Sequence, residues 1–194
     1  MKACTVQSIY YNQAPDALRR EIAVLLNRIW PDDSLMSSGT IPAAHDESLN
    51  ARSFFAYVDE RLVSYAGVVR KSIKHEGHFF NIAGLSCVAT DPDYQAQGLG
   101  LQTVAAATQW IEQSGADLGI FTCKPHLAGF YDRAGAWPVV PDVTLIGSRD
   151  RGALSSESLQ VVVLMRLFSP KAYAYESILR HTTIDLGLPV GQFL

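Results

Sequence analysis

The stretch Cys87-Val-Ala-Thr-Asp-Pro-Asp-Tyr-Gln-Ala-Gln-Gly-Leu-Gly-Leu-Gln102 holds the features that decide the fold. An apolar run over 84–90 predicts a buried strand, and Asp91-Pro-Asp93 ends it. A turn with two glycines then leads into a helical pattern whose apolar residues share one face. This order leaves several backbone N–H groups unpaired at the start of the helix. The helix dipole there favours an anion such as a pyrophosphate.

The two glycines, Gly98 and Gly100, allow a positive φ and let a phosphate approach the backbone without meeting a Cβ. They are also compatible with a plain strand–turn–helix connection. A P-loop would need Lys and Ser or Thr after the glycines, and a Rossmann fingerprint would need glycine where Thr103 stands. The pattern that remains is Pro-x-Tyr-Gln-x-x-Gly-x-Gly between a strand and a helix.

This pattern resembles the pyrophosphate-binding motif of the GNAT superfamily of N-acetyltransferases, which bind acetyl-coenzyme A. The segment Phe130-Tyr-Asp-Arg-Ala-Gly-Ala-Trp137 resembles the Leu-Tyr-x-x-x-Gly-Phe element on the fourth helix of that superfamily. The resemblance covers about 53–168 and is firmest over 84–137. Within the superfamily the chain looks most similar to aminoglycoside 2′-N-acetyltransferases. A weaker likeness is to the nodulation N-acyltransferases, which use long acyl donors.

The composition indicates one globular domain. The chain has 194 residues, of which 48% are apolar and 18% charged. We therefore expect a single domain over 1–194, with a C-terminal extension at about 170–194. The net charge of −3 argues against nucleic acid as the main partner. Three cysteines without metal-like spacing, no signal-peptide pattern and no apolar run near the ~18 residues of a membrane span predict a cytoplasmic protein with no membrane partner.

The hydrophobic pattern predicts strands in hairpins, followed by a strand–helix–strand–helix–strand unit. Expected strands lie at 5–11, 53–58, 62–73, 79–90, 117–123, 139–146 and 159–168, and helices begin near 15, 99, 125 and 171. The segment 31–51 is interpreted as a long loop that covers a binding cleft. The fold class is α/β, a mixed and mostly antiparallel twisted sheet with helices on both faces. The resemblance implies that strands four and five splay apart, with the cofactor between them.

The resemblance also implies how acetyl-coenzyme A is held. Val88 and Thr90 would offer backbone groups to the thioester and the pantetheine arm, and Gln95 would brace the turn. Backbone N–H groups from Ala96 to Leu101 would surround the pyrophosphate. The implied cofactor-binding residues are Val88, Ala89, Thr90, Gln95, Ala96, Gln97, Gly98, Leu99, Gly100 and Leu101.

Two catalytic residues follow from the same resemblance. Tyr131 would act as general acid towards the thioester sulfur, and the alternative is a core tyrosine that packs the fourth helix. Many family members carry a glutamate on the fourth strand, where this chain has Gly84 and Ser86. Ser86 is therefore expected to orient a water rather than act as a base. A thiol nucleophile at Cys123, beside His126, is weighed against a buried structural cysteine, which is the favoured reading.

No metal site is expected, because His45, His75 and His78 have no ligand spacing with an acidic pair. The predicted function is transfer of an acetyl group from acetyl-coenzyme A to a primary amine of a small, aminoglycoside-like molecule. The alternatives are a longer acyl donor, a protein amine as acceptor, and a module that binds acetyl-coenzyme A without turnover. A homodimer is a further expectation. An enzyme base from the 31–51 loop, namely His45, Asp46 or Glu47, remains open.

Overall fold

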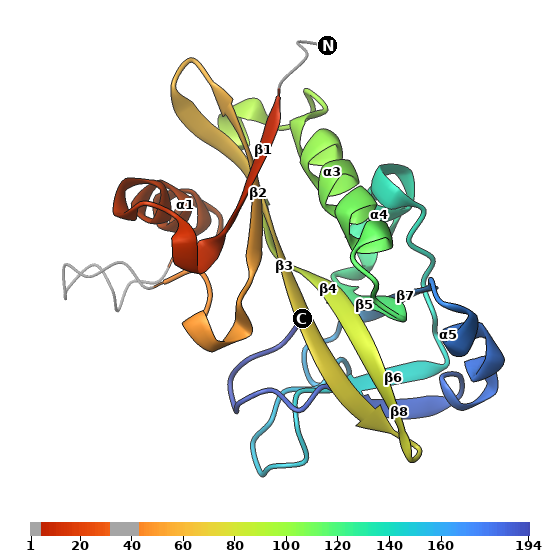
Figure 1. Ribbon diagram of the computed structural model, residues 1–194. Coiled ribbons are helices and arrows are strands. Elements are labelled where there is room, and N and C mark those ends of the chain that lie inside the picture. The colour runs from red at the N-terminus through yellow and green to blue at the C-terminus, as the bar shows by residue number, and fades with distance from the viewer. Residues whose placement is uncertain (1–4, 32–42) are drawn as a thin grey trace. The chain divides into compact units, whose positions relative to one another are not determined.

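The structure is a computed structural model of the chain, and it describes residues 5–31 and 43–194. It divides into two compact units, Met1–Val69 with Leu85–Thr108, and Arg70–Gly84 with Gln109–Leu194. Strands β3 (Arg61–His75) and β4 (His78–Thr90) run through both units (Figure 1). The two residues between them, Glu76 and Gly77, both have a positive φ, as a tight hairpin turn requires.

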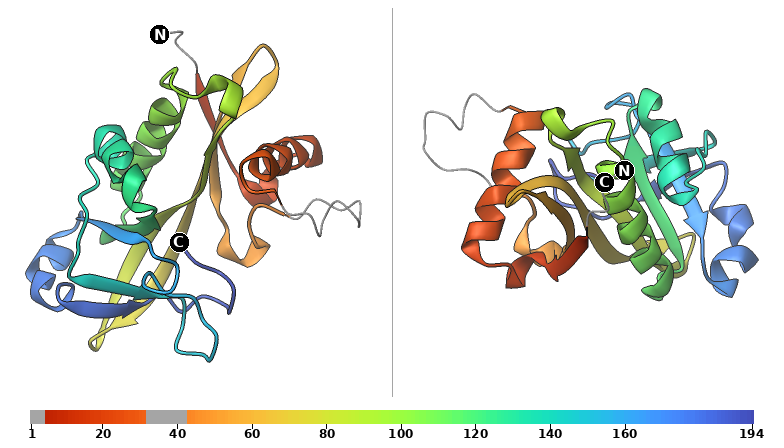
Figure 2. Two further views of the ribbon diagram at one scale, coloured as in Figure 1. Left: turned by 180° about the vertical axis from the view of Figure 1, so that it is seen from behind. Right: turned by 90° about the horizontal axis from the view of Figure 1, so that it is seen from above.

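The first unit holds four neighbouring strands in the order β1-β2-β3-β4, with β1 at Val6–Tyr10 and β2 at Arg52–Val58. β1 pairs with β2, and β2 with β3, in antiparallel fashion. Every residue of β3 from 62 to 69 is buried, so both faces of the strand are covered. Helix α1 (Asp16–Ile29) and the first part of α3 (Leu99–Gln113) lie on opposite sides of these strands (Figures 1 and 2).

The second unit continues the sheet through β4, β5 (Leu118–Cys123) and β7 (Val162–Leu167), which completes the order β1-β2-β3-β4-β5-β7. β5 is parallel to β4 and antiparallel to β7. The sheet is therefore mixed and mostly antiparallel, as the sequence predicts. The parallel ladder joins two pairs, Ile82 with Leu118 and Ala83 with Gly119. Because the ladder is so short, β4 and β5 pair only near the start of β5.

The short helix of the second unit is fixed by aromatic packing on β5. Helix α4 (Ala128–Gly135) ends just before Trp137, which is only 1% exposed. A Cβ on Gly119 would lie 2.4 Å from the Trp137 ring, so the absence of a side chain on β5 makes room for the indole. Phe121 meets the same indole edge-to-face with 4.9 Å between ring centroids. Trp137 is thus a core residue.

The C-terminal region differs from the expectation in two places. The strand predicted at 139–146 is β6 (Val143–Ile146), since Pro141 interrupts the run before it. It pairs in parallel with β8 (Thr182–Asp185), in a separate two-stranded sheet, whereas β7 joins the main sheet. No strand is expected at β8 from the sequence, because four residues are too few to show a period.

Three further segments complete the described chain. The helix expected to begin near 171 is α5 (Pro170–Ala174), followed by a 3-10 helix at Glu176–Ile178. Of the 31–51 loop, residues 32–42 lie outside the described part, and Glu47–Leu49 form a 3-10 helix. Over 5–31 and 43–194, the helices are too short or too polar to traverse a lipid bilayer.

Candidate functional site

The connection from β4 to α3 adopts a backbone conformation suited to an anion. Two residues of this loop are left-handed, Ala96 with φ +59° and Gly98 with φ +85°. Alternation of left- and right-handed residues turns successive N–H groups towards one side and forms an anion-binding nest. Gly98 has the positive φ that the sequence predicts, whereas Gly100 lies within α3 and has no positive φ. An alanine in the other left-handed position carries backbone strain that its residue type did not reveal.

The N-terminus of α3 adds free donors beside this nest. Gln102 N–H makes a helical bond to the Gly98 carbonyl, at 3.1 Å. The N–H groups of Leu99, Gly100 and Leu101 come before it and have no partner within the helix. Leu99 is 3% exposed and anchors the helix start in the core. Together the loop and the helix end fit a pyrophosphate, since both direct donors and positive partial charge outwards.

Two glutamine side chains cross the loop. Gln95 Nε2 donates to the Thr90 carbonyl at 3.1 Å, and Gln97 Nε2 donates to the Asp93 carbonyl at 3.3 Å. The amide of Gln102 lies in the first turn of α3, and its Nε2 is buried with no partner among the described residues. The sequence analysis did not single out Gln102. Its side-chain amide is a buried donor without a partner among the described residues, next to the nest, and is therefore available to a ligand.

The middle of β4 is distorted. Cys87 has a φ of +53°, and Ser86, Cys87 and Val88 are all half-buried. A left-handed residue within a strand breaks the alternation and re-aims nearby peptide groups, a feature that clusters at functional sites. Ser86 Oγ donates to Cys87 Sγ at 3.6 Å, and burial raises the pKa of the Cys87 thiol. The sequence carries no signal for this distortion, because cysteine is not a residue that favours a positive φ.

No side chain fits at position 84 of β4. A Cβ on Gly84 would lie 2.5 Å from the Ile120 carbonyl oxygen and 3.0 Å from Leu194 Cδ1. The Leu194 carbonyl accepts a hydrogen bond from Thr122 N–H at 3.1 Å, which fixes it against β5. The lack of a carboxylate at position 84 is therefore built into the packing.

Tyr131 lies on α4 in the second unit and is 6% exposed. Its ring packs edge-to-face on Phe121 and Phe130, with centroids 5.1 and 5.0 Å away. Burial, and next the neighbouring Cys123, raise the pKa of the Tyr131 phenol. Among the described residues its hydroxyl has no hydrogen-bond partner. The ring is thus a packing residue, and its hydroxyl is uncommitted.

Cys123 and His126 do not form a nucleophile and base. Burial raises the pKa of the Cys123 thiol to about 11, so it is a neutral thiol at pH 7, and His126 is exposed. In the part of the chain that the structure describes, no three His, Cys, Asp or Glu residues gather in a way that could hold a metal ion.

His45, from the described end of the 31–51 loop, is inserted against the strands of the first unit. Its Nε2 lies 2.9 Å from the Tyr65 hydroxyl, which lies 3.0 Å from Ser53 Oγ. A Cβ on Gly67 would be 2.4 Å from that Nε2, so the ring occupies the space that a side chain would fill. Burial lowers the pKa of His45 to about 4. By contrast, Asp46 and Glu47 are exposed.

Solved structures with this fold include three that cover most of the chain. Escherichia coli ElaA is 13% identical with a TM-score of 0.59, and the match covers 84% of this chain and 99% of ElaA. An acyl-CoA N-acyltransferase from Pseudomonas aeruginosa is 16% identical with a TM-score of 0.57, over 84% and 99% of the two chains. The YhbS N-acetyltransferase of Escherichia coli, in complex with CoA, is 16% identical with a TM-score of 0.53, over 87% and 83%. No curated protein matches the chain.

The likeness to these structures shows the fold, and a family model shows the family. Residues 19–136, more than half of the chain, match the acetyltransferase (GNAT) family. The matched range includes most of α1, β2 to β5, the β4–α3 loop and α4. The chain is therefore an acyltransferase that belongs to the acetyltransferase (GNAT) family.

Proposed function

We propose that this enzyme transfers an acetyl group from acetyl-coenzyme A to a primary amine of a small molecule. The observation that carries the proposal is the left-handed loop at Ala96 and Gly98, which leads directly into the open N-terminus of α3. Such a loop selects a ligand with a pyrophosphate group. Acetyl-coenzyme A has that group and supplies the acetyl thioester.

In this proposal backbone groups do most of the binding. N–H groups over 96–101 hold the pyrophosphate, with Gln95 and Gln97 bracing the loop and Gln102 offering a further donor. The backbone of Val88, Ala89 and Thr90 holds the pantetheine arm and the thioester carbonyl. The left-handed Cys87 supports this role, because it turns peptide groups out of the regular pattern next to these residues.

Tyr131 acts in the proposal as the acid for the departing sulfur. Its raised pKa keeps the phenol protonated throughout the neutral range, so a proton is available when negative charge develops. Its uncommitted hydroxyl supports the same role, since no other acceptor in the described chain competes for the proton.

The acceptor amine loses its proton to water in this proposal. An alkyl ammonium has a pKa of about 10 and attacks only once it is neutral. Position 84 has no room for a carboxylate, and His45 is already hydrogen-bonded, with its pKa lowered to about 4. Ser86 and neighbouring carbonyls would then hold the water that accepts the proton.

Release of free thiol from acetyl-coenzyme A tests the proposal. The acceptor panel should contain short alkyl amines, an aminoglycoside and a peptide with a free N-terminal alanine. The peptide is included because one similar fold is the ribosomal-protein-S18-alanine N-acetyltransferase of Escherichia coli, at 15% identity and a TM-score of 0.53. We expect thiol release with a small amine and slower release from longer acyl donors. Turnover with the peptide alone, or coenzyme A binding without turnover, would contradict the proposal.

A further inference from the structure

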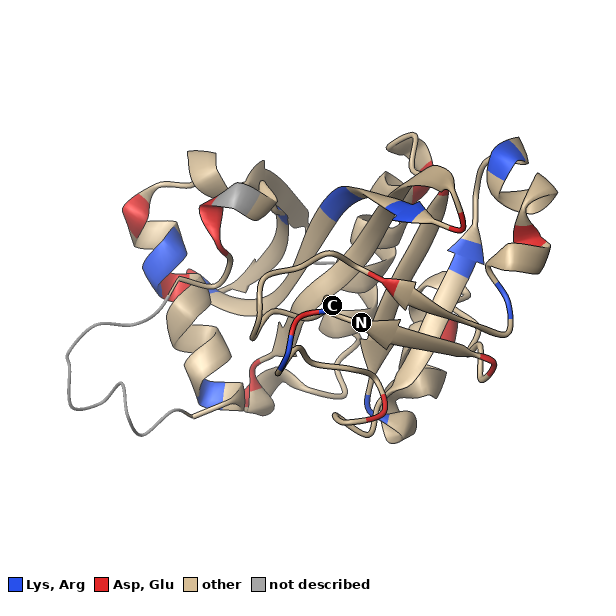
Figure 3. Cartoon of the chain, turned by 90° about the horizontal axis from the view of Figure 1, so that it is seen from below, with Lys and Arg blue, Asp and Glu red and all other residues tan. Residues whose placement is uncertain are grey.

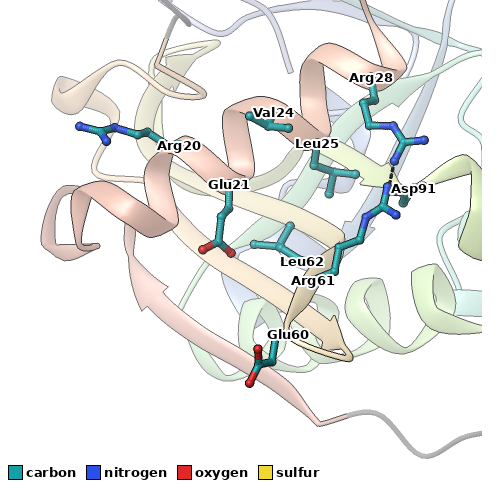
Figure 4. Close-up of a pocket in the computed structure, with 9 residues that line it drawn as sticks. All are labelled: Arg20, Glu21, Val24, Leu25, Arg28, Glu60, Arg61, Leu62 and Asp91. Atoms are coloured by element: carbon teal, nitrogen blue, oxygen red, sulfur yellow. Dashed lines mark hydrogen bonds and ion pairs between the residues drawn. The ribbon is translucent and has the colours of Figure 1, made fainter.

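A buried carboxylate with two arginine partners lies at the start of the β4–α3 loop. Asp91 directly follows β4 and is 1% exposed. Its Oδ2 accepts hydrogen bonds from Arg28 Nη1 at 2.7 Å and from Arg61 Nη2 at 2.6 Å (Figure 4). Its Oδ1 accepts from Asp93 N–H at 3.1 Å, and its own N–H donates to the Val63 carbonyl at 2.8 Å. The Oδ2 atom and the N–H group of Asp91 therefore tie the start of the loop to α1 and β3, whereas Oδ1 closes a turn within the loop.

The two arginines come from different elements of the first unit. Arg28 lies in the last turn of α1, and Arg61 is the first residue of β3. The tight turn before Arg61 is made by Asp59 and Glu60, with φ values of +47° and +63°. This turn fixes the position of Arg61 at the start of β3. Through Arg61, the β4–α3 loop is joined to the β2–β3 hairpin.

The same arginines also hold the next residues of the loop. Arg28 Nη2 lies 3.2 Å from Asp93 Oδ2, and the Arg61 guanidinium stacks over the Tyr94 ring at 5.6 Å. The two arginines thus hold the segment 91–94 through the side chains of Asp91, Asp93 and Tyr94. This segment comes immediately before the left-handed residues at 96 and 98. A displacement of 91–94 would be passed directly to the nest, because only Gln95 lies between them.

The arginines can be interpreted in two ways. They line an open groove of about 450 Å³ with Val24, Leu25 and Leu62, and their side chains are 37% and 45% exposed. Exposed cations close to a phosphate-binding loop would attract a polyanion directly. Alternatively, they act on the loop through Asp91, whose burial without partners would be strongly unfavourable. The charge-assisted bonds favour the second interpretation, since both guanidinium groups already point at the carboxylate.

We propose that Asp91, Arg28 and Arg61 form a positioning cluster that holds the β4–α3 loop in its anion-binding conformation. This inference rests on the proposed function of that loop. The two interpretations predict opposite signs for Asp91→Asn. Removal of the carboxylate frees two cations, so direct attraction predicts tighter binding of coenzyme A. Loss of positioning predicts weaker binding, because the nest is no longer held in shape.

Calorimetric titration with coenzyme A, paired with acetyl-transfer kinetics, tests the cluster. We expect Asp91→Asn to weaken coenzyme A binding by roughly 10-fold or more and to raise the KM for acetyl-coenzyme A. The kcat at saturating acetyl-coenzyme A should stay within about twofold, as should the KM for the amine. Glu60→Gln is the matched control, because it removes the same charge from the same groove at an exposed residue. It should leave the affinity unchanged.

The arginines give an independent arm if Asp91→Asn does not fold. Arg28→Gln should weaken binding, whereas Arg20→Gln on the same helix should not. The double variant Arg28→Gln/Glu60→Gln restores the net charge of the groove, and we expect it to bind as weakly as Arg28→Gln. The loss should also persist in about 0.5 M salt, where surface attraction is screened.

The results distinguish loop positioning from direct attraction of the anion by the arginines. Equal or tighter binding by Asp91→Asn, or recovery of affinity in the double variant, overturns the positioning cluster while the proposed function stands. A wild-type enzyme that does not bind coenzyme A overturns the proposed function and the cluster with it.

Discussion

Single residues determine the chemistry in this proposal, and the role of Tyr131 as general acid can be tested by one substitution. Tyr131→Phe keeps the ring that packs on Phe121 and removes only the hydroxyl. We expect kcat to fall roughly 10²-fold or more, with little change in coenzyme A affinity. Steady-state kinetics measure the change in kcat, and calorimetric titration with coenzyme A measures the change in affinity separately. Full turnover with a good amine would make Tyr131 a packing residue only.

Ser86 and the acceptor together determine the pH dependence. With no side-chain base at position 84, kcat/KM should rise with pH towards the pKa of the amine itself. The midpoint should therefore move when amines of different basicity are compared. Ser86→Ala should lower the rate by about 10-fold, since remaining groups still hold the water. One midpoint near pH 6–7 for every amine would instead indicate an enzyme base.

His45 links pH to stability. Its pKa is lowered from 6.5 to about 4 by burial, so between these values the unfolded chain binds a proton that the folded chain does not. Stability is therefore lost as the pH falls through this window, by about 2 kcal/mol between pH 7 and pH 5. The His45→Gln variant can still bond to Tyr65. Between pH 7 and pH 5 its free energy of unfolding, measured by urea titration, should fall by about 2 kcal/mol less than that of the wild type. An equal loss in both proteins would place His45 in a wetter environment.

At the scale of elements, α4 shows how a helix end departs from its sequence pattern. A glycine near a helix end usually takes the left-handed position, but Gly135 is the last helical residue, and Ala136 takes that position with φ +51°. Ala136→Gly should thus raise the free energy of unfolding by about 1 kcal/mol. Ala134→Gly, inside the same helix, should lower it by about 1 kcal/mol. Urea titrations of both variants measure the difference, and stabilisation by neither would contradict this cap.

The elements that sequence predicted well are those with a strong period or a clear break. The strand before Asp91, the helix from Leu99 and the hairpin around Asp59 follow from apolar patterning and turn residues. The strand at Thr182 did not, because its partner β6 is distant in sequence. The left-handed Ala96 and Cys87 and the insertion of His45 depend on tertiary packing, which local residue preferences do not encode.

At the scale of the whole molecule, charge constrains how coenzyme A is bound. The chain carries a net charge of −3, and positive and negative side chains are interspersed along the described residues (Figure 3). Overall electrostatics therefore do not attract a polyanion, and binding must come from local donors. The β4–α3 loop offers such donors in its backbone, whose contribution does not depend on the net charge.

The affinity of Gly98→Val for coenzyme A, measured by calorimetry together with a thermal melt, shows whether the β4–α3 loop binds the pyrophosphate. Gly98 has a φ of +85°, and the branched side chain would crowd the nest. Gly152→Val is the matched control, because its φ is +88° and the space around it is open. We predict that Gly98→Val, and likewise Gly100→Val, lose coenzyme A binding while Gly152→Val binds as the wild type does. A folded Gly98→Val protein with unchanged affinity would contradict the assignment of this loop.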